Sequence, residues 1–264
     1  MVVSTTCCAV STAITSARRK YTFGVPDASA LPDRLDTVAH TAYLAFTAGY
    51  SPGSGPDLLR ADLAGEAVRL GRTVLGLRPD EPVLVTLLAL MLFQHSRRDA
   101  RVVDGRLVLL ADQDRRQWHD EEIDEARRLL DHPSLREPIS AQAAAYALQA
   151  RIAAEHALAV TPEETRWHRI VGLYDLLLEL TPTPAARLAR AVAVGEDRGP
   201  VAGLAALEGV EIPASHRPAA VRAELLSRAG DVDAARAAYD QAIAACRNDV
   251  ERTFLLGRRA ELGA

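Results

Sequence analysis

The sequence predicts an all-α protein built as an array of paired helices, interrupted by at most one short β-hairpin near residues 101–110. Three observations support this fold class. Apolar residues recur at intervals of three and four along most of the chain, which is helical spacing. Alanine, leucine and arginine dominate while aromatic residues make up only 5%, a composition that favours packed helices over sheets. The second half of the chain also repeats at intervals of about 33 residues.

The 264 residues are expected to divide into three parts. Residues 1–30 are predicted to be a tail without regular structure. Residues 31–135 are predicted to form an amino-terminal group of helices, and residues 136–264 a series of helical repeats. A chain of this length can bury a substantial core.

The first helix is predicted over residues 31–49, with Pro32 in its first turn. Its core-facing residues recur at helical spacing: Leu35, Val38, Ala42 and Phe46. Gly49 is expected to stop this helix and Tyr50 to pack its ring just beyond, and a binding site at this pair is the less favoured alternative. Residues 51–56 are rich in glycine, proline and serine and predict a loop.

A second helix is predicted to begin at Asp57, whose carboxylate can act as its N-cap, and to end near Leu77. The residues expected to face the core are Leu59, Leu63, Val68, Leu70 and Val74. The segment 78–82 contains two prolines and is expected to end this helix and start the next, which extends to about Ser96. The apolar run 83–93 within it is too short to cross a bilayer and predicts a buried core helix.

Residues 101–110 break the helical pattern. An Asp104-Gly105 turn stands between β-branched and apolar residues, which is typical of a β-hairpin. Another helix is predicted over residues 116–131, and His132-Pro133 is expected to stop it.

Helices follow one another from Ser140 onward, and a repeat emerges among them. Equivalent positions are Ile170, Ala202 and Ala235, followed four residues later by Tyr174, Ala206 and Tyr239. A period near 34 residues is that of tetratricopeptide helix–turn–helix repeats. The last copy fits best, because Gly230-Asp231 supplies the turn between its two helices. We therefore expect a tetratricopeptide-like array.

The segment Leu107–Trp118, with the sequence LVLLADQDRRQW, combines an apolar run with a polar cluster and one of the two tryptophans of the chain. Its candidate functional residues are Asp112, Gln113, Asp114, Arg115 and Trp118. The favoured interpretation is structural: an aspartate caps the next helix, the arginine pairs with an acid, and the tryptophan packs on the core. Contact with a partner comes second. Acid–base chemistry or cation binding by the two aspartates is the least favoured interpretation.

This segment resembles the long helical carboxy-terminal extension of one group of extracytoplasmic-function RNA polymerase sigma factors. The resemblance runs from about Pro32 to Leu262 and rests on further matching segments: residues 57–70, 79–82, 87–92, 173–177, 190–194, 199–200 and 223–226. Two departures stand out. This chain has Thr47-Ala48 where the family usually has Asn-Glu, and Ala189 where it usually has asparagine.

The resemblance implies a protein-interaction and regulatory module of transcription initiation that lacks the promoter-binding sigma core. Only segments 17–20 and 24–26 resemble the end of that core. The expected partner is a protein: the sigma core, RNA polymerase, or an unknown peptide or helix. The alternative is a stand-alone tetratricopeptide-like scaffold unrelated to polymerase. An enzyme using Asp112 and Asp114 is a third and unfavoured hypothesis.

Bulk properties narrow the remaining classes. The formal net charge is −4 without a long basic run, so direct nucleic-acid binding is not expected. The nearest basic segment, residues 97–101, is interpreted as solvated surface. Cys7, Cys8 and Cys246 form neither a disulfide framework nor a zinc spacing, which favours the reducing cytoplasm. No histidine pair has a zinc-protease spacing, so neither metal nor cofactor is predicted, and no apolar run is long enough for a membrane span.

Overall fold

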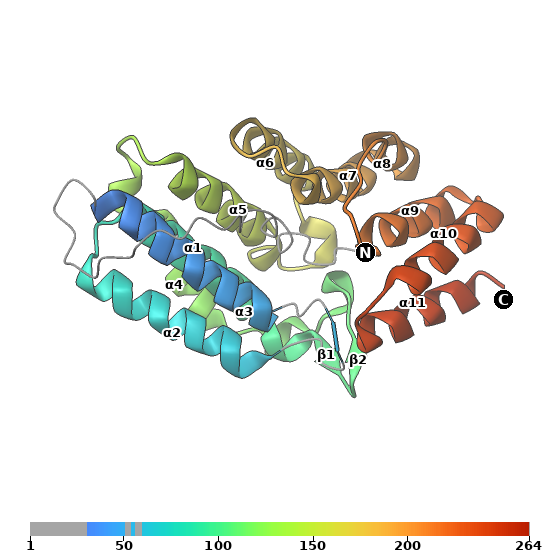
Figure 1. Cartoon of the computed structure of the whole chain (residues 1–264), viewed down its shortest axis with the longest axis horizontal. Helices are drawn as coiled ribbons and strands as arrows, with labels where there is room; N and C mark the ends of the chain where they lie inside the picture. Colours follow the sequence, from blue (N-terminus) through green and yellow to red (C-terminus); the bar gives the residue numbers. More distant parts are fainter. Residues whose placement is uncertain (1–30, 51–53, 56–59, 264) are drawn as a thin grey trace, which may run out of the picture.

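The computed structural model describes residues 31–50, 54–55 and 60–263, which fold into eleven α-helices and a two-stranded sheet. The helices are α1 (Leu31–Tyr50), α2 (Ala61–Leu77), α3 (Pro82–His95), α4 (Asp120–Leu130), α5 (Ala141–Ala157), α6 (Trp167–Leu180), α7 (Pro184–Arg198), α8 (Pro200–Ala206), α9 (Arg217–Ala229), α10 (Val232–Ala245) and α11 (Asp249–Glu261). They form a curved array with α1–α4 at one end and α9–α11 at the other (Figure 1). The all-α prediction is therefore confirmed. The predicted tail lies outside the described residues.

Helix α3 is the centre of the amino-terminal part. Every residue from Val83 to His95 is buried, because α1, α2, α4 and α5 all pack around it. The prediction of a buried core helix at residues 83–93 is confirmed. Pro82 occupies the first turn, where its missing N–H costs no hydrogen bond.

The inward face of α1 is only partly as predicted. Leu35, Ala42 and Phe46 are buried, but Val38 is 40% exposed, so that prediction is wrong. The packing explains this, because α1 places Ala39 and Tyr43 against its neighbours instead.

Helix α2 differs more from its prediction. Val68 is buried, whereas Leu63 and Leu70 are 38% and 48% exposed, and the prediction for these two is wrong. The helix instead buries its smallest residues: Ala64, Ala67 and Gly71. Small residues let neighbouring helices approach closely, which leaves the longer side chains at the edge of the contact. The helix starts at Ala61, and the predicted Asp57 cap and Leu59 lie outside the described residues.

The predicted hairpin is confirmed. Strands β1 (Val102–Val103) and β2 (Arg106–Leu107) pair antiparallel, with Val102 opposite Leu107. Asp104 and Gly105 form the turn and both have positive φ, at 50° and 73°. Asn, Asp and Gly tolerate this backbone better than other residues, which is why the Asp-Gly pair signals a tight turn.

The carboxy-terminal part consists of successive antiparallel helix pairs, α5 with α6, α7 with α8 and α9 with α10. The predicted repeat positions fall on the second helix of each pair. Ile170 and Tyr174 of α6 and Ala235 and Tyr239 of α10 are buried. Gly230 ends α9 in the left-handed conformation, with φ 86°, and Asp231 caps α10 by accepting from the Ala234 N–H.

Helix α5 belongs to both halves of the array. Ala150 and Ala154 pack in the core around α3, whereas Ala145 and Ile152 pack in the core of α6 and α7. The predicted division at residues 135/136 stays a prediction, and the shared helix joins the two cores continuously.

Two contacts join the far ends of the array. Strand β2 lies against α11. Gly55, in the connection between α1 and α2, forms a backbone bridge with the turn before α11: its N–H donates to the Arg247 carbonyl at 3.3 Å, and the Asp249 N–H donates to the Gly55 carbonyl at 3.1 Å. The array is therefore closed on itself rather than open at both ends.

Among the helices of the described residues, none has the length and apolar character needed to cross a membrane.

Candidate functional site

The polar segment after the hairpin forms short turns instead of the start of a long helix. Leu110–Asp112 and Arg115–Gln117 are single 3₁₀ turns, and α4 begins only at Asp120. The predicted helix start at residue 116 is wrong because Trp118 is extended, with φ −79° and ψ 145°, and interrupts the helix. Asp114 caps the second 3₁₀ turn by accepting from the Arg116 N–H at 3.1 Å.

The two aspartates face outward. Asp112 is exposed, and Asp114 forms an ion pair with Arg116 at 2.9 Å. The hydrogen bonds from Arg116 lower the pKa of Asp114, which favours its ionised form and not a proton-donating role. Gln113, between them, is buried and donates to the Val108 carbonyl at 3.3 Å. This arrangement closes the hairpin and gives no support to paired acid–base chemistry.

Trp118 and Arg115 connect this segment to the end of α5. The indole ring is 6% exposed and packs in the core around α3. The Arg115 guanidinium lies 4.4 Å from the centre of that ring and donates to the carbonyls of His156 and Ala159 at 3.0 and 2.7 Å. These carbonyls lie at the end of α5, where the helix dipole favours a cation.

Tyr50 is the counterpart at the end of α1. Its fully buried ring stacks on Phe46 with a centroid distance of 5.3 Å. The Arg101 guanidinium lies 3.8 Å from the Tyr50 ring and donates to the Tyr50 carbonyl, and Arg97 donates to the Tyr50 hydroxyl at 2.9 Å. The expected packing of this ring is confirmed. The helix itself ends one residue later than predicted, at Tyr50.

Gly49 lies inside the last turn of α1 and permits a close approach. A Cβ at this position would stand 2.5 Å from the backbone nitrogen of Ala64 in α2. Backbone cannot move away as a flexible side chain can, so only glycine fits. The predicted role as a helix stop is replaced by a role in helix packing.

Arg97, Arg101 and Arg115 together form what we call the arginine cluster. Arg97 and Arg101 are 9% and 6% exposed, so the interpretation of residues 97–101 as solvated surface is wrong. Within the described part of the chain, no carboxylate lies at ion-pair distance from these three side chains. Their charge is offset by carbonyls and aromatic faces at the ends of α1 and α5. Burial lowers the pKa of Arg97 and of Arg115.

His156 shows the electrostatic effect of this cluster. Burial, followed by the charges of Arg97 and Arg115, lowers the pKa of His156 to about 3. Its ring contacts Trp167 edge-on at a centroid distance of 5.1 Å. The histidine is therefore neutral at physiological pH, and the junction between the two halves carries positive charge from arginine alone.

An apolar groove lies where α5 meets α6 and α7, bordered by α1, with a cavity of about 310 Å³. Tyrosines and glutamines of the groove bond to one another: the Tyr43 hydroxyl donates to Gln149 at 3.4 Å, and the Gln142 amide donates to the Tyr146 hydroxyl at 3.2 Å. Burial raises the pKa of Tyr146 to about 12, so its hydroxyl stays protonated. The α7 side of the groove consists of small residues: Ala185, Ala186 and Ala189.

None of the residues predicted from the 107–118 segment or from Gly49-Tyr50 lines this groove. Sequence analysis missed it because its residues come from four helices and read individually as core positions. Ala189, one of the two departures described in the sequence analysis, lines the groove.

Three comparisons with known proteins bear on this structure. The model of a family of unknown function, DUF6596, matches residues 34–134. An uncharacterized protein, R00370, of Rhizobium meliloti (strain 1021) is 43% identical over 237 residues, which is 88% of this chain and 55% of that protein. The chain thus spans about half the length of this relative.

The third comparison concerns the fold. The crystal structure of TTC0263, a thermophilic TPR protein in Thermus thermophilus, matches with a TM-score of 0.50 and 16% sequence identity, covering 89% of this chain and 98% of that one. This likeness confirms the predicted tetratricopeptide-like helical array.

Proposed function

We propose that the chain is a protein-interaction module that regulates a bacterial extracytoplasmic-function sigma factor in the cytoplasm. The residues that support this are those of the sequence resemblance, above all the 107–118 segment. The tetratricopeptide-like fold suits it, since stacked helix pairs present surfaces that bind peptides or helices. The length of the Rhizobium relative is compatible with it as well, because 55% coverage leaves room there for a sigma core.

The apolar groove between α5 and α7 is the observation that carries the proposal. Concave apolar pockets with a few placed polar groups are the usual form of a binding site. Because no acidic residue, lysine or arginine among the described residues lines this groove, its occupant is an apolar side chain of a partner helix or peptide. The Gln142 and Gln149 amides at its wall can hydrogen-bond to the partner's backbone.

The arginine cluster and the 112–118 segment have a supporting role in this proposal. They fix the ends of α1 and α5, two of the helices that border the groove. We therefore assign Tyr50, Arg115 and Trp118 to the positioning of these helices rather than to direct contact.

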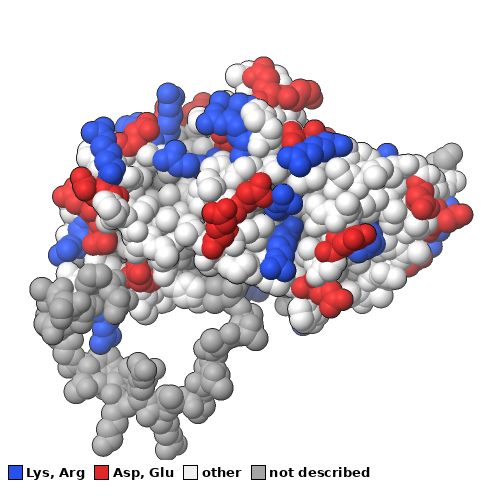
Figure 2. Space-filling model, turned by 90° about the horizontal axis from the view of Figure 1, so that it is seen from above, with Lys and Arg blue, Asp and Glu red and all other residues white. Residues whose placement is uncertain are grey.

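Direct promoter binding is not part of the proposed function. Figure 2 shows acidic and basic side chains interspersed with uncharged residues over the face displayed, without a broad basic area. Nucleic-acid-binding surfaces usually concentrate their lysines and arginines on one face.

The test is a binding measurement with two candidate partners, core RNA polymerase and the separately expressed part of the Rhizobium relative that this chain does not match. Leu180→Glu places a charge at the rim of the groove, where Leu180 is 44% exposed. Leu176→Glu is the matched control, since Leu176 is on the same helix, 50% exposed, and does not line the groove. We expect binding to at least one partner, weakened at least about tenfold by Leu180→Glu only.

Two results would count against the proposal in different ways. Absence of binding to both partners would favour the alternative of a stand-alone scaffold unrelated to polymerase. Equal losses from Leu180→Glu and Leu176→Glu would show that the partner binds elsewhere than in the groove.

A further inference from the structure

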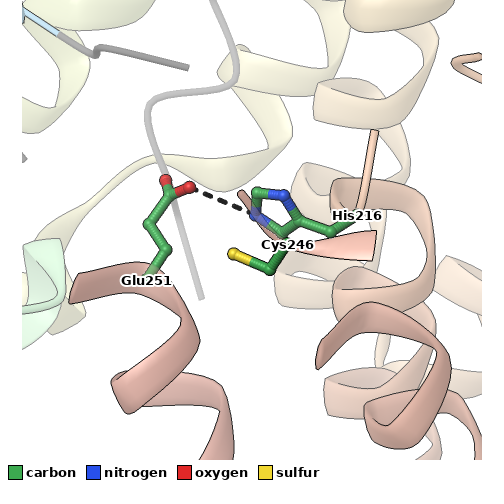
Figure 3. Close-up of side chains that lie close together, drawn as sticks. All are labelled: His216, Cys246 and Glu251. Atoms are coloured by element: carbon green, nitrogen blue, oxygen red, sulfur yellow. Dashed lines mark ion pairs between the residues drawn. The ribbon is translucent and has the colours of Figure 1, made fainter. Parts of the chain in front are cut away.

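Three side chains with metal-ligand chemistry meet in the carboxy-terminal part of the array (Figure 3). His216 directly precedes α9, Cys246 directly follows α10, and Glu251 lies in the first turn of α11. One ligand atom from each lies within 4.8 Å of the others. Cys246 and Glu251 are buried and His216 is half-buried. The trio is separate from the groove, and the charge of Arg101 in the arginine cluster acts on the Glu251 carboxylate.

The imidazole contacts the carboxylate through one of its nitrogens. His216 Nε2 lies 3.2 Å from a Glu251 oxygen, and the Cys246 sulfur points toward the same side of the ring (Figure 3). In a nucleophilic triad the imidazole instead bridges thiol and carboxylate through its two different nitrogens. The Cys246 thiol donates to the Asn248 carbonyl at 3.4 Å, and its sulfur stays within 4.8 Å of the other two ligand atoms.

The surrounding contacts hold the ligands in place. The Asn248 side chain accepts from the Val250 and Glu251 N–H groups at 3.1 and 3.0 Å, which fixes the turn that carries both Cys246 and Glu251. The second carboxylate oxygen of Glu251 lies 3.6 Å from the Arg217 guanidinium. A ligating carboxylate commonly has such an outer partner, which orients it and leaves the other oxygen for the metal.

We propose that His216, Cys246 and Glu251 bind a divalent transition metal of the zinc class. Thiolate, imidazole and carboxylate are the three side-chain ligands that Zn²⁺ takes in proteins, and Mg²⁺ or Ca²⁺ would not select a buried thiol. Binding replaces the Cys246 thiol proton by a metal–sulfur bond and releases that proton to solvent. Three protein ligands leave a fourth position for water or a further ligand.

The proposal is tested on the full chain, freed of metal by chelation, by titration with Co²⁺ and Zn²⁺. The protein carries Cys7→Ser and Cys8→Ser so that Cys246 is its only thiol. We expect a sulfur-to-cobalt charge-transfer band, displacement of Co²⁺ by Zn²⁺, and proton release on Zn²⁺ binding. Cys246→Ser should abolish the band, and Glu251→Gln and His216→Ala should each weaken Zn²⁺ binding at least about tenfold. His168→Ala, at an exposed histidine, is the control and should change nothing.

Circular dichroism of each variant establishes that the helices are intact. Absence of the charge-transfer band in the protein with Cys246 as its only thiol overturns the proposal. The proposal is also overturned if the band appears but neither His216→Ala nor Glu251→Gln weakens Co²⁺ binding, since Cys246 would then bind the ion alone. These readouts do not depend on the groove or on any partner protein.

Discussion

Replacing Trp118 tests whether the 107–118 segment is part of the structural core. Truncation of a buried tryptophan to alanine costs about 3–5 kcal/mol, and the ring of Trp118 is 6% exposed. Two further effects oppose each other. Loss of the Arg115 cation–π contact at 4.4 Å adds about 0.5–2 kcal/mol. Removal of the buried indole N–H, which has no acceptor among the described residues, returns about 1–3 kcal/mol. The expected net loss is therefore about 3 kcal/mol.

Trp118→Phe is the matched variant. It keeps an aromatic face for the Arg115 guanidinium and removes the unsatisfied N–H, so its stability should stay within about 1 kcal/mol of the parent. Urea unfolding followed by circular dichroism measures the stability of both variants. If the unfolding free energy depends on urea concentration as steeply as in the parent, the unfolded states are comparable. Equal midpoints for the parent and Trp118→Ala would refute the packing argument and indicate a ring that is free to bind a partner.

Four further outcomes follow from the structure. Asp114→Ala removes only a surface cap and the Arg116 ion pair, so the thermal midpoint should fall far less than with Trp118→Ala; unchanged melting with lost partner binding would instead mark a contact site. Gly49→Ala forces a Cβ to 2.5 Å from the Ala64 nitrogen, and denaturant unfolding should show a loss of about 2 kcal/mol or more. Because the pKa of His156 is lowered to about 3 in the fold, only the unfolded chain protonates it between pH 6.5 and 3, and stability should fall by about 2 kcal/mol from pH 7 to pH 5. Urea midpoints should show a clearly smaller loss in His156→Gln, and an equal loss would contradict a neutral buried histidine. Gel-shift assays at physiological salt should show no sequence-selective DNA binding, and a salt-sensitive shift on one promoter would overturn this expectation.

Helices and the hairpin could be predicted from the sequence because their signals are local. Pro82 and the apolar run after it determine α3, and Asp104-Gly105 determines the hairpin turn. The orientation of α2 was not predictable in the same way. Apolar residues are common on protein surfaces, so the helical spacing of the exposed Leu63 and Leu70 looks the same as that of a buried face. The face of α2 that is actually buried is determined by the close packing of its alanine and glycine residues.

The candidate sites depended on contacts between distant segments. Arg97 and Arg101 resemble solvated residues in sequence, and only the converging ends of α1 and α5 reveal why they are buried. The metal-ligand trio escaped sequence analysis for a related reason. His216 is thirty residues before Cys246, and no spacing rule connects a residue before α9 with the turn that leads into α11.

The backbone bridge between Gly55 and Asn248 changes how the array should unfold. In an open helical solenoid each repeat contacts only its neighbours, so terminal repeats can fray while the centre stays folded. Here α11 is held by the connection between α1 and α2 and by strand β2. Opening the last helix therefore breaks contacts with the beginning of the described fold. Native-state hydrogen exchange should report α11 opening together with these amino-terminal contacts, as one cooperative unit rather than as a separate fraying end.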